Sequence, residues 1–201
     1  FNSLGYYKNY NTNIKEQVII NNLNYQSIPK YFDNGLVNNK NFLLKNVNSK
    51  AKNSQNFKNN ISNTLLPTIQ STYTFPLVKE TERFDNILTP KLSLKLSPNY
   101  TRDIRNQNEG RIDYFNIYDV DRLGIEEANE GGISATYGYE YTKFDKSIFA
   151  EKMKFGFANN IRLSENKDLP SHTNLGDKVS DFVGLFEYNS KDNFKLNIIF
   201  L

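Results

Sequence analysis

Strict alternation of apolar and polar side chains marks two stretches of this chain as β-strands. In residues 133–142, Tyr137, Tyr139 and Tyr141 fall in one phase, while Thr136 and Glu140 fall in the other. In residues 88–97 every second position is Leu or Pro, and the positions between them are Thr, Lys or Ser. Successive side chains of a strand point to opposite faces, so this period of two predicts strands with one apolar and one polar face.

Weaker alternation predicts further strands on both sides of these two. We expect them at 65–77, 149–161, 182–188 and 194–201, with three more at 4–10, 18–25 and 36–47. The sequence Asp33-Asn34-Gly35 is a hairpin turn signal between the second and third of those N-terminal strands. The polar run at 50–60 is expected to be a loop.

Long and short connections alternate along the second half of the chain. Long polar loops are expected at 99–132 and 163–181, and short turns at 144–146 and 189–193. Outer-membrane barrels pair long loops with short turns in this way, and strands of about nine to eleven residues match the hydrocarbon thickness. Soluble sheets usually have strands of about five or six residues.

We therefore predict an all-β fold that forms part of an antiparallel transmembrane β-barrel. As a fragment it would be a curved open sheet of about seven or eight strands, and the two long loops would cap its outer end. A general outer-membrane porin or receptor barrel is one alternative. A soluble β-rich binding module, with its apolar faces against another protein layer, is a second.

Composition favours strands over spanning helices or disorder. Aromatic residues reach 14% although the hydrophobic fraction is only 38%, and disordered chains are poor in aromatic residues. No run approaches the roughly 20 apolar residues that a membrane-spanning helix needs. The net charge of +3 comes from scattered residues, which gives no electrostatic footprint for nucleic acid. There is no Cys, which excludes disulfides, thiol catalysis and Cys-ligated metals.

The two faces of the predicted strands supply the first candidate functional residues. Lumen-facing candidates are Lys91, Ser93, Lys95, Thr136 and Glu140, and lipid-facing candidates are Leu92, Leu94, Tyr137, Tyr139, Phe155 and Phe157. The two lysines could contact anionic sugar and phosphate groups, or they could solvate the lumen and balance Glu140. The tyrosines fit an interfacial aromatic girdle.

An acidic group in the first long loop is a further candidate site. Its members are Asp119, Asp121, Glu126, Glu127 and Glu130. These carboxylates could bind divalent cations, but their spacing matches no EF-hand, and solvated loop charges are the simpler interpretation. His172 is the only His, and we expect it to be a solvated loop residue, not a zinc ligand. No catalytic triad can be built around it, so we predict no enzymatic activity, no cofactor and no metal.

A set of short sequences in a fixed order carries a family resemblance. The set consists of Leu66-Pro67, Phe75-Pro76-Leu77, Thr89-Pro90-Lys91-Leu92, Ser97-Pro98-Asn99, Phe115-Asn116-Ile117-Tyr118, Asp121-Arg122-Leu123-Gly124, Glu130-Gly131-Gly132, Leu169-Pro170, Leu175, Ser180-Asp181-Phe182-Val183-Gly184 and the turn at 189–193. No single piece is specific, but their order and spacing are. Residues 65–201 resemble the barrel domain of the LptD family (also called OstA or Imp), and residues 1–64 resemble it loosely. We expect one partial barrel domain over residues 1–201.

The resemblance implies an outer-membrane protein of a Gram-negative bacterium that places lipopolysaccharide in the outer leaflet. The implied partners are lipopolysaccharide, an LptE-like plug lipoprotein and an LptA-like periplasmic bridge. The best-known members contain disulfides, which cannot be assigned in a chain without Cys. The sequence begins with Phe1 in place of Met and stops inside the strand-like run 194–201, so we expect a fragment of a longer product, with the periplasmic jellyroll and the lateral gate outside it.

Overall fold

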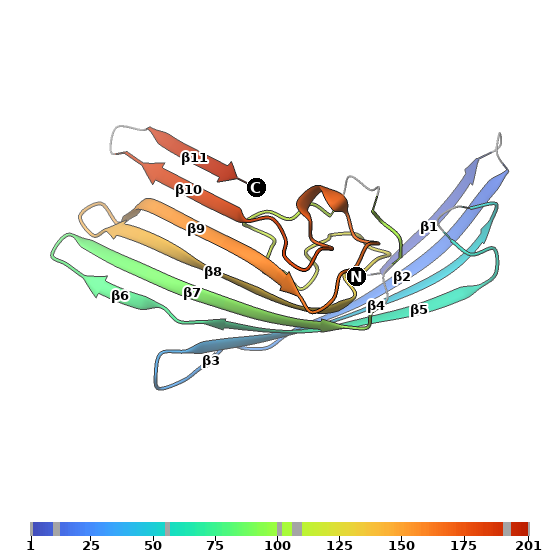
Figure 1. Ribbon diagram of the computed structural model, residues 1–201, viewed down its shortest axis with the longest axis horizontal. Helices are drawn as coiled ribbons and strands as arrows, with labels where there is room; N and C mark the ends of the chain where they lie inside the picture. The colour runs from blue at the N-terminus through green and yellow to red at the C-terminus, as the bar shows by residue number, and fades with distance from the viewer. Residues whose placement is uncertain are drawn as a thin grey trace.

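The computed structural model describes residues 2–9, 13–54, 57–99, 102–105, 110–190 and 194–200, and these form one curved antiparallel sheet with two long loops (Figure 1). The strands are β1 (Asn2–Asn9), β2 (Ile14–Gln26), β3 (Lys30–Tyr31), β4 (Val37–Lys52), β5 (Ser62–Thr74), β6 (Leu77–Glu80), β7 (Phe84–Ser97), β8 (Gly132–Asp145), β9 (Ala150–Arg162), β10 (Val183–Asn189) and β11 (Lys195–Phe200). A single turn of 3-10 helix, η1 (Ser171–Thr173), lies in the second long loop.

Strand order follows chain order, as expected for a meander. The sheet runs β1-β2-β4-β5-β7-β8-β9-β10-β11, with β3 paired to β4 and β6 paired to β7. The predicted all-β antiparallel class is confirmed, but the predicted count of seven or eight strands is wrong, because the described residues contain eleven. Two of the additional strands, β3 and β6, are only two and four residues long. Their short runs beside turns carry no readable period of two.

The observed turns agree only in part with the turns predicted from the sequence. Gly35 has a φ of 84° in the turn between β3 and β4, where the Phe32 amide donates to the Leu36 carbonyl at 2.9 Å. Strand β4 continues to Lys52 and so enters the segment that was expected to be a loop. The β8–β9 turn occupies 146–149 instead of 144–146, since β8 extends past a bulge to Asp145. Of the expected turn at 189–193, residues 191–193 lie outside the described part of the chain.

The sheet has two chemically different faces, which we call the inner and the outer face. The inner face carries alternate residues that the two long loops cover, among them Leu43, Lys45, Val47, Leu66, Thr68, Gln70, Ser93, Lys95, Thr136 and Asn160. The outer face carries their neighbours in sequence and has no covering layer in the described structure. Exposed members of that face are Ile19, Leu23, Leu65, Ile69, Leu92, Leu94, Leu96, Ile133, Tyr137, Tyr139 and Ile161.

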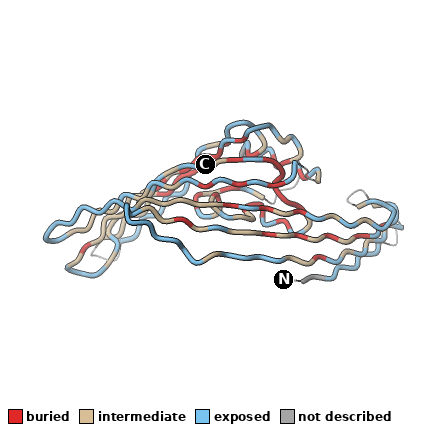
Figure 2. Tube along the Cα trace, turned by 90° about the horizontal axis from the view of Figure 1, so that it is seen from below, coloured by how far each residue is buried: buried red, intermediate tan, exposed pale blue. Residues whose placement is uncertain are grey.

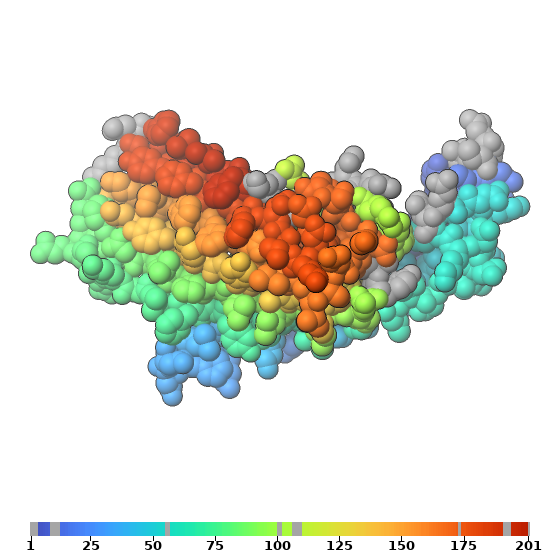
Figure 3. Space-filling model, viewed as in Figure 1, coloured from blue at the N-terminus to red at the C-terminus, as the bar shows by residue number. Residues whose placement is uncertain are grey.

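The two long connections, 98–131 between β7 and β8 and 163–182 between β9 and β10, lie against the inner face (Figure 1). We call them the first loop and the second loop. In the space-filling view the second loop, in orange, covers the middle of the sheet (Figure 3). Buried stretches of the chain gather where these loops meet the strands (Figure 2). The loops thus fold back over the inner face of the sheet, and that they cap the outer end of a barrel stays a prediction.

Apolar loop side chains explain this placement. The main cluster of buried residues consists of Ile104, Ile112, Tyr114, Ile117, Leu123, Ile125, Ala128, Leu169 and Leu175 from the loops and Ala158, Val183 and Leu185 from the sheet. Removing this apolar surface from water drives the loops onto the strands. Among the described residues, no helix is long and apolar enough to cross a membrane.

Candidate functional site

Glu130 lies at the centre of a buried charge cluster where the first loop meets the inner face. Its carboxylate is 2% exposed. Arg122 donates to it from Nε at 2.6 Å and from Nη2 at 2.5 Å, and Arg162 donates from Nη1 at 2.5 Å. Lys95 contributes a third cation, with Nζ 3.3 Å from Oε2. One loop carboxylate is thus paired with cations from the loop itself and from β7 and β9.

The cations of this cluster are fixed by further hydrogen bonds. Arg122 also donates to Thr136 Oγ1 at 3.0 Å and to Asn160 Oδ1 at 2.9 Å. Arg162 donates to the Gly131 carbonyl, and Lys95 donates to a loop carbonyl at 3.1 Å. Polar groups buried this deeply cost free energy unless they are bonded, so every bond here favours the docked loop.

The ionisation of Glu130 follows from its three cations. Burial alone would raise the pKa of the Glu130 carboxyl, but the neighbouring positive charges outweigh burial and hold that pKa well below its usual range. A lowered carboxyl pKa stabilises the folded state above about pH 4.5, the ordinary value, and this contribution is lost only as pH falls below it. The cluster is therefore expected to persist through mildly acidic conditions.

A second set of polar contacts between the first loop and the sheet involves Lys45, which is fully buried on β4. Its Nζ lies 2.7 Å from Asp121 Oδ2 and donates to the carbonyls of Ile125 at 2.6 Å and Ala128 at 2.9 Å. Beside it, the Asn129 amide donates to the hydroxyls of Thr68 and Ser97, and Gln70 donates to the Tyr118 carbonyl at 2.9 Å. The first loop is therefore held by side chains of β4, β5, β7, β8 and β9.

Two glycines on the inner face receive tyrosines from the first loop. A Cβ at Gly156 would overlap the Tyr114 ring, and a Cβ at Gly138 would overlap the Tyr118 hydroxyl. The Tyr114 hydroxyl donates to Glu140 at 2.8 Å, and Glu140 also pairs with Lys91 at 3.8 Å and Lys154 at 3.3 Å. These glycines let the aromatic rings approach the strand backbone.

Gly156→Ala is expected to weaken docking of the first loop. The added methyl displaces Tyr114 from its site, and overpacking of this kind costs about 1–3 kcal/mol. Hydrogen exchange of residues 110–118 should accelerate in the variant. Gly5→Ala in β1 is the control, since a Cβ there meets only a carbonyl oxygen at 3.9 Å. Equal exchange in the two variants would contradict the proposed packing.

The second loop is attached to the sheet and to the first loop. Backbone bonds from Arg162 to the Lys178 carbonyl and from Ser180 to the Asn160 carbonyl continue the pairing of β9, both at 2.9 Å. Asn159 donates to the Ser180 carbonyl at 2.7 Å. Ile104 of the first loop donates to the Asp168 carbonyl at 2.8 Å. The two loops therefore behave as one layer on the inner face.

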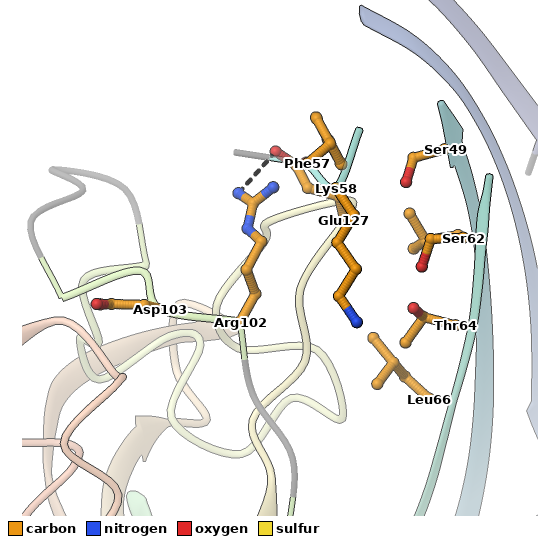
Figure 4. Close-up of a pocket in the computed structure, with 10 residues that line it drawn as sticks. Ser49, Phe57, Lys58, Ser62, Thr64, Leu66, Arg102, Asp103 and Glu127 are labelled. Atoms are coloured by element: carbon orange, nitrogen blue, oxygen red, sulfur yellow. Dashed lines mark hydrogen bonds and ion pairs between the residues drawn. The ribbon is translucent and has the colours of Figure 1, made fainter. Parts of the chain in front are cut away.

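A hollow of about 270 Å³ remains between this layer and the strands β4 and β5. In Figure 4, Ser49, Ser62 and Thr64 project from the strands toward Arg102 and Lys58. Arg102 pairs with Glu127 at 3.0 Å, and its guanidinium lies 5.3 Å from the centre of the Phe57 ring. Hydroxyl groups facing cations are suited to hydrogen-bonding a polar or anionic group.

The structure places the predicted strand residues as follows. The candidates Lys91, Ser93, Lys95, Thr136 and Glu140 share the inner face, and the candidates Leu92, Leu94, Tyr137, Tyr139, Phe155 and Phe157 share the outer face. The separation into two faces thus agrees with the alternation, and the ion pair of Lys91 with Glu140 was anticipated. The assignment of those faces to lumen and lipid stays a prediction. Lys95, Ser93 and Thr136 are buried under the first loop instead of lining open space.

The interpretation of the acidic group as solvated charges is wrong for Glu130. The other members take separate roles: Asp121 pairs with Lys45, Glu127 pairs with Arg102, and Asp119 and Glu126 are exposed. Partial desolvation by the surrounding loop raises the pKa of the Asp119 carboxyl. Within the described ranges, no three potential ligands gather as a metal site. His172 is exposed in η1, as expected.

Three cations of this site were not singled out from the sequence. Lys45 lies in phase with Leu43 and Val47, and a Lys between two apolar residues of one phase signals a buried partner. The sequence around Arg122 and Arg162 contains no comparable indication that these side chains are buried with a partner. Their partners lie 8 and 32 residues away in the chain.

Comparison with known families gives one match that covers nearly the whole chain. The family model described as LptD, LPS transport system D, matches residues 8–198. The match therefore includes most of residues 1–64, where the sequence landmarks are sparse. No curated protein matches the chain.

Proposed function

Because the chain belongs to the LptD family of the lipopolysaccharide transport system, we propose that it forms part of the outer-membrane translocon that inserts lipopolysaccharide into the outer leaflet. The observation that carries this proposal is the contrast between the two faces of one sheet. Large apolar side chains stay exposed along the outer face, while charged and polar side chains are enclosed on the inner face. Exposed apolar patches of this extent mark a surface that meets lipid or a partner.

In this proposal the sheet is a segment of barrel wall in the outer membrane. The outer face contacts the acyl chains, and the inner face with its two loops occupies the hydrated interior. The long-loop ends of the strands lie toward the cell surface, and the short turns 81–83 and 146–149 lie toward the periplasm. The strands β2, β4, β5, β7, β8 and β9 have 13 to 16 residues each, which is long enough for a tilted passage.

In this proposal, side chains of the inner face and of the hollow contact the transported lipid. Lys91 and Glu140 line the interior beside the docked tyrosines, and the hollow at Lys58 and Arg102 offers polar contacts to sugar or phosphate groups of lipopolysaccharide in transit. The partners in this scheme are lipopolysaccharide, an LptE-like plug lipoprotein and an LptA-like periplasmic bridge. In this proposal the protein conducts a lipid and places it in the outer leaflet, and it makes or breaks no covalent bond.

Depletion of the protein from the cells that produce it tests the proposal. We expect newly made lipopolysaccharide to stop reaching the surface, measured by protection of the lipid from a surface-acting modifying enzyme. Restoration of the gene should restore delivery. Continued arrival of lipopolysaccharide in depleted cells would overturn the transport role. A protein that stays monodisperse in water without detergent or lipid would overturn the membrane location.

A further inference from the structure

Three cations surround one aromatic ring at the short-turn end of the sheet. The Nζ of Lys143 lies 4.3 Å from the centre of the Phe84 ring, and the Nζ of Lys152 lies 5.5 Å from it. The guanidinium of Arg83 lies 5.0 Å from the same centre. The ring attracts each cation, but the three like charges repel one another, so the group gains stability if an anion joins it.

Strand register places Phe84 and Lys143 of this group on the outer face. Lys143 is paired with Asn86, and Leu88 with Tyr141, in the same phase of β7 and β8 as the apolar positions at Leu92 and Tyr137. The Tyr141 hydroxyl donates to Asn86 Oδ1 at 2.8 Å, which confirms that these side chains lie on one side. The cations therefore follow directly on the apolar band, at the end where the strands turn.

The cations around Phe84 differ in whether they have a carboxylate partner. Arg83 pairs with Asp145 at 3.2 Å, whereas Lys143 and Lys152 have no carboxylate within 4.0 Å among the described residues. Nearby lysines differ in this respect, because Lys146 pairs with Asp85 at 2.8 Å and Lys154 pairs with Glu140 at 3.3 Å. Lys143 and Lys152 are therefore the cations beside Phe84 that have no ion-pair partner in the described part of the chain.

Further charged side chains lie at this end of the sheet. Lys79 is paired in register with Asn86 and is exposed on the same face. Glu80 is paired with Asp85 in the other phase of the strands. Glu82 is exposed in the turn beside Arg83. Asp145 is paired in register with Phe84, but its carboxylate is buried and engaged with Arg83 and Ser147. Glu151 is exposed and paired in register with Phe144. Acidic side chains are thus present at this end, but among the described residues none forms an ion pair with Lys143 or Lys152.

We propose that Phe84, Lys143 and Lys152 form a binding site for the phosphate of an anionic phospholipid headgroup in the periplasm-facing leaflet. The inference rests on the proposed membrane location, and it adds a lipid distinct from the transported one. A phospholipid fits both halves of the surface, since its acyl chains lie along the apolar band and its phosphate meets the two ammonium groups. Net negative headgroups are preferred because lysines near the membrane surface are attracted to anionic lipids.

The first experiment separates this site from the membrane location itself. The purified protein is mixed with phosphatidylcholine vesicles and with vesicles that also contain phosphatidylglycerol, and flotation reports insertion. Failure to insert into either would overturn the proposed function and this site together. Insertion into both, without any preference for phosphatidylglycerol in the next experiment, would overturn this site alone.

The second experiment measures lipid binding by native mass spectrometry of the detergent-solubilised protein. We expect phosphatidylglycerol to bind more tightly than phosphatidylcholine. The double variant Lys143→Gln/Lys152→Gln should lose about fivefold in phosphatidylglycerol affinity for each lysine removed, with phosphatidylcholine binding unchanged. The control Lys146→Gln/Lys154→Gln removes two lysines that already have carboxylate partners and should keep the preference.

Three outcomes of that measurement would overturn the site. One is equal phosphatidylglycerol affinity in the double variant and the unaltered protein. Another is an equal loss in the control variant, which would show that only total charge matters. The third is displacement of the lipid by soluble glycerol 1-phosphate, which would show a free-anion site with no need for the apolar band.

Discussion

Glu130→Gln is expected to release the first loop from the inner face and to cost about 3–5 kcal/mol of docking free energy. The substitution keeps the shape of the side chain but removes its charge. Arg122, Arg162 and Lys95 would then be buried together without a counter-charge, and each would repel the other two. Because these cations come from the loop and from two strands, the loop must separate from the sheet to rehydrate them.

Hydrogen exchange of residues 110–131 measures this release. Exchange should accelerate there by several orders of magnitude if the full cost is confined to the loop, while β7 and β8 stay protected. Glu165→Gln is the matched control, since Glu165 is exposed in the second loop and its replacement should leave exchange unchanged. Unaltered protection of the first loop in Glu130→Gln would show that apolar packing alone holds it.

The two faces of the sheet could be predicted because strand alternation is local. Ser93 and Lys95 differ from Leu92 and Leu94 by one position, and the strand geometry alone sends them to opposite sides. The strand count was underestimated because alternation cannot be recognised in very short strands. A two-residue strand such as β3 is defined by its pairing with β4 and not by its own sequence.

The position of the long loops could not be predicted in the same way. Their apolar residues, such as Ile112, Ile117 and Ile125, are isolated among polar ones and show no period. What buries them is the presence of matching apolar and small residues on β9 and β10, far away in the chain. Loop charges are usually solvated, and Glu130 departs from that rule because three cations from separate segments meet it.

The buried charges give the docked loops a property that a purely apolar contact lacks. Ion pairs between loop and strand depend on position, so only one placement of the loop satisfies Glu130 and Asp121 at once. Buried polar contacts of this kind fix a specific arrangement, even when their net contribution to stability is modest.

Leu92→Lys is expected to cost about 2–4 kcal/mol of folding free energy in a bilayer, the penalty for a lysine on the lipid face near the midplane. Leu92 is 42% exposed on the outer face, and in water a substitution at so open a position would change stability by no more than about 0.5 kcal/mol. The matched control is Ile148→Lys, at a residue that is 45% exposed but lies in the β8–β9 turn. Urea titrations of both variants in lipid vesicles, followed by the gel mobility of the folded protein, measure the difference. A large cost at residue 92 with little or none at residue 148 would show that the outer face is in an apolar environment, as the membrane location requires, whereas equal small costs would place it in water and overturn that location.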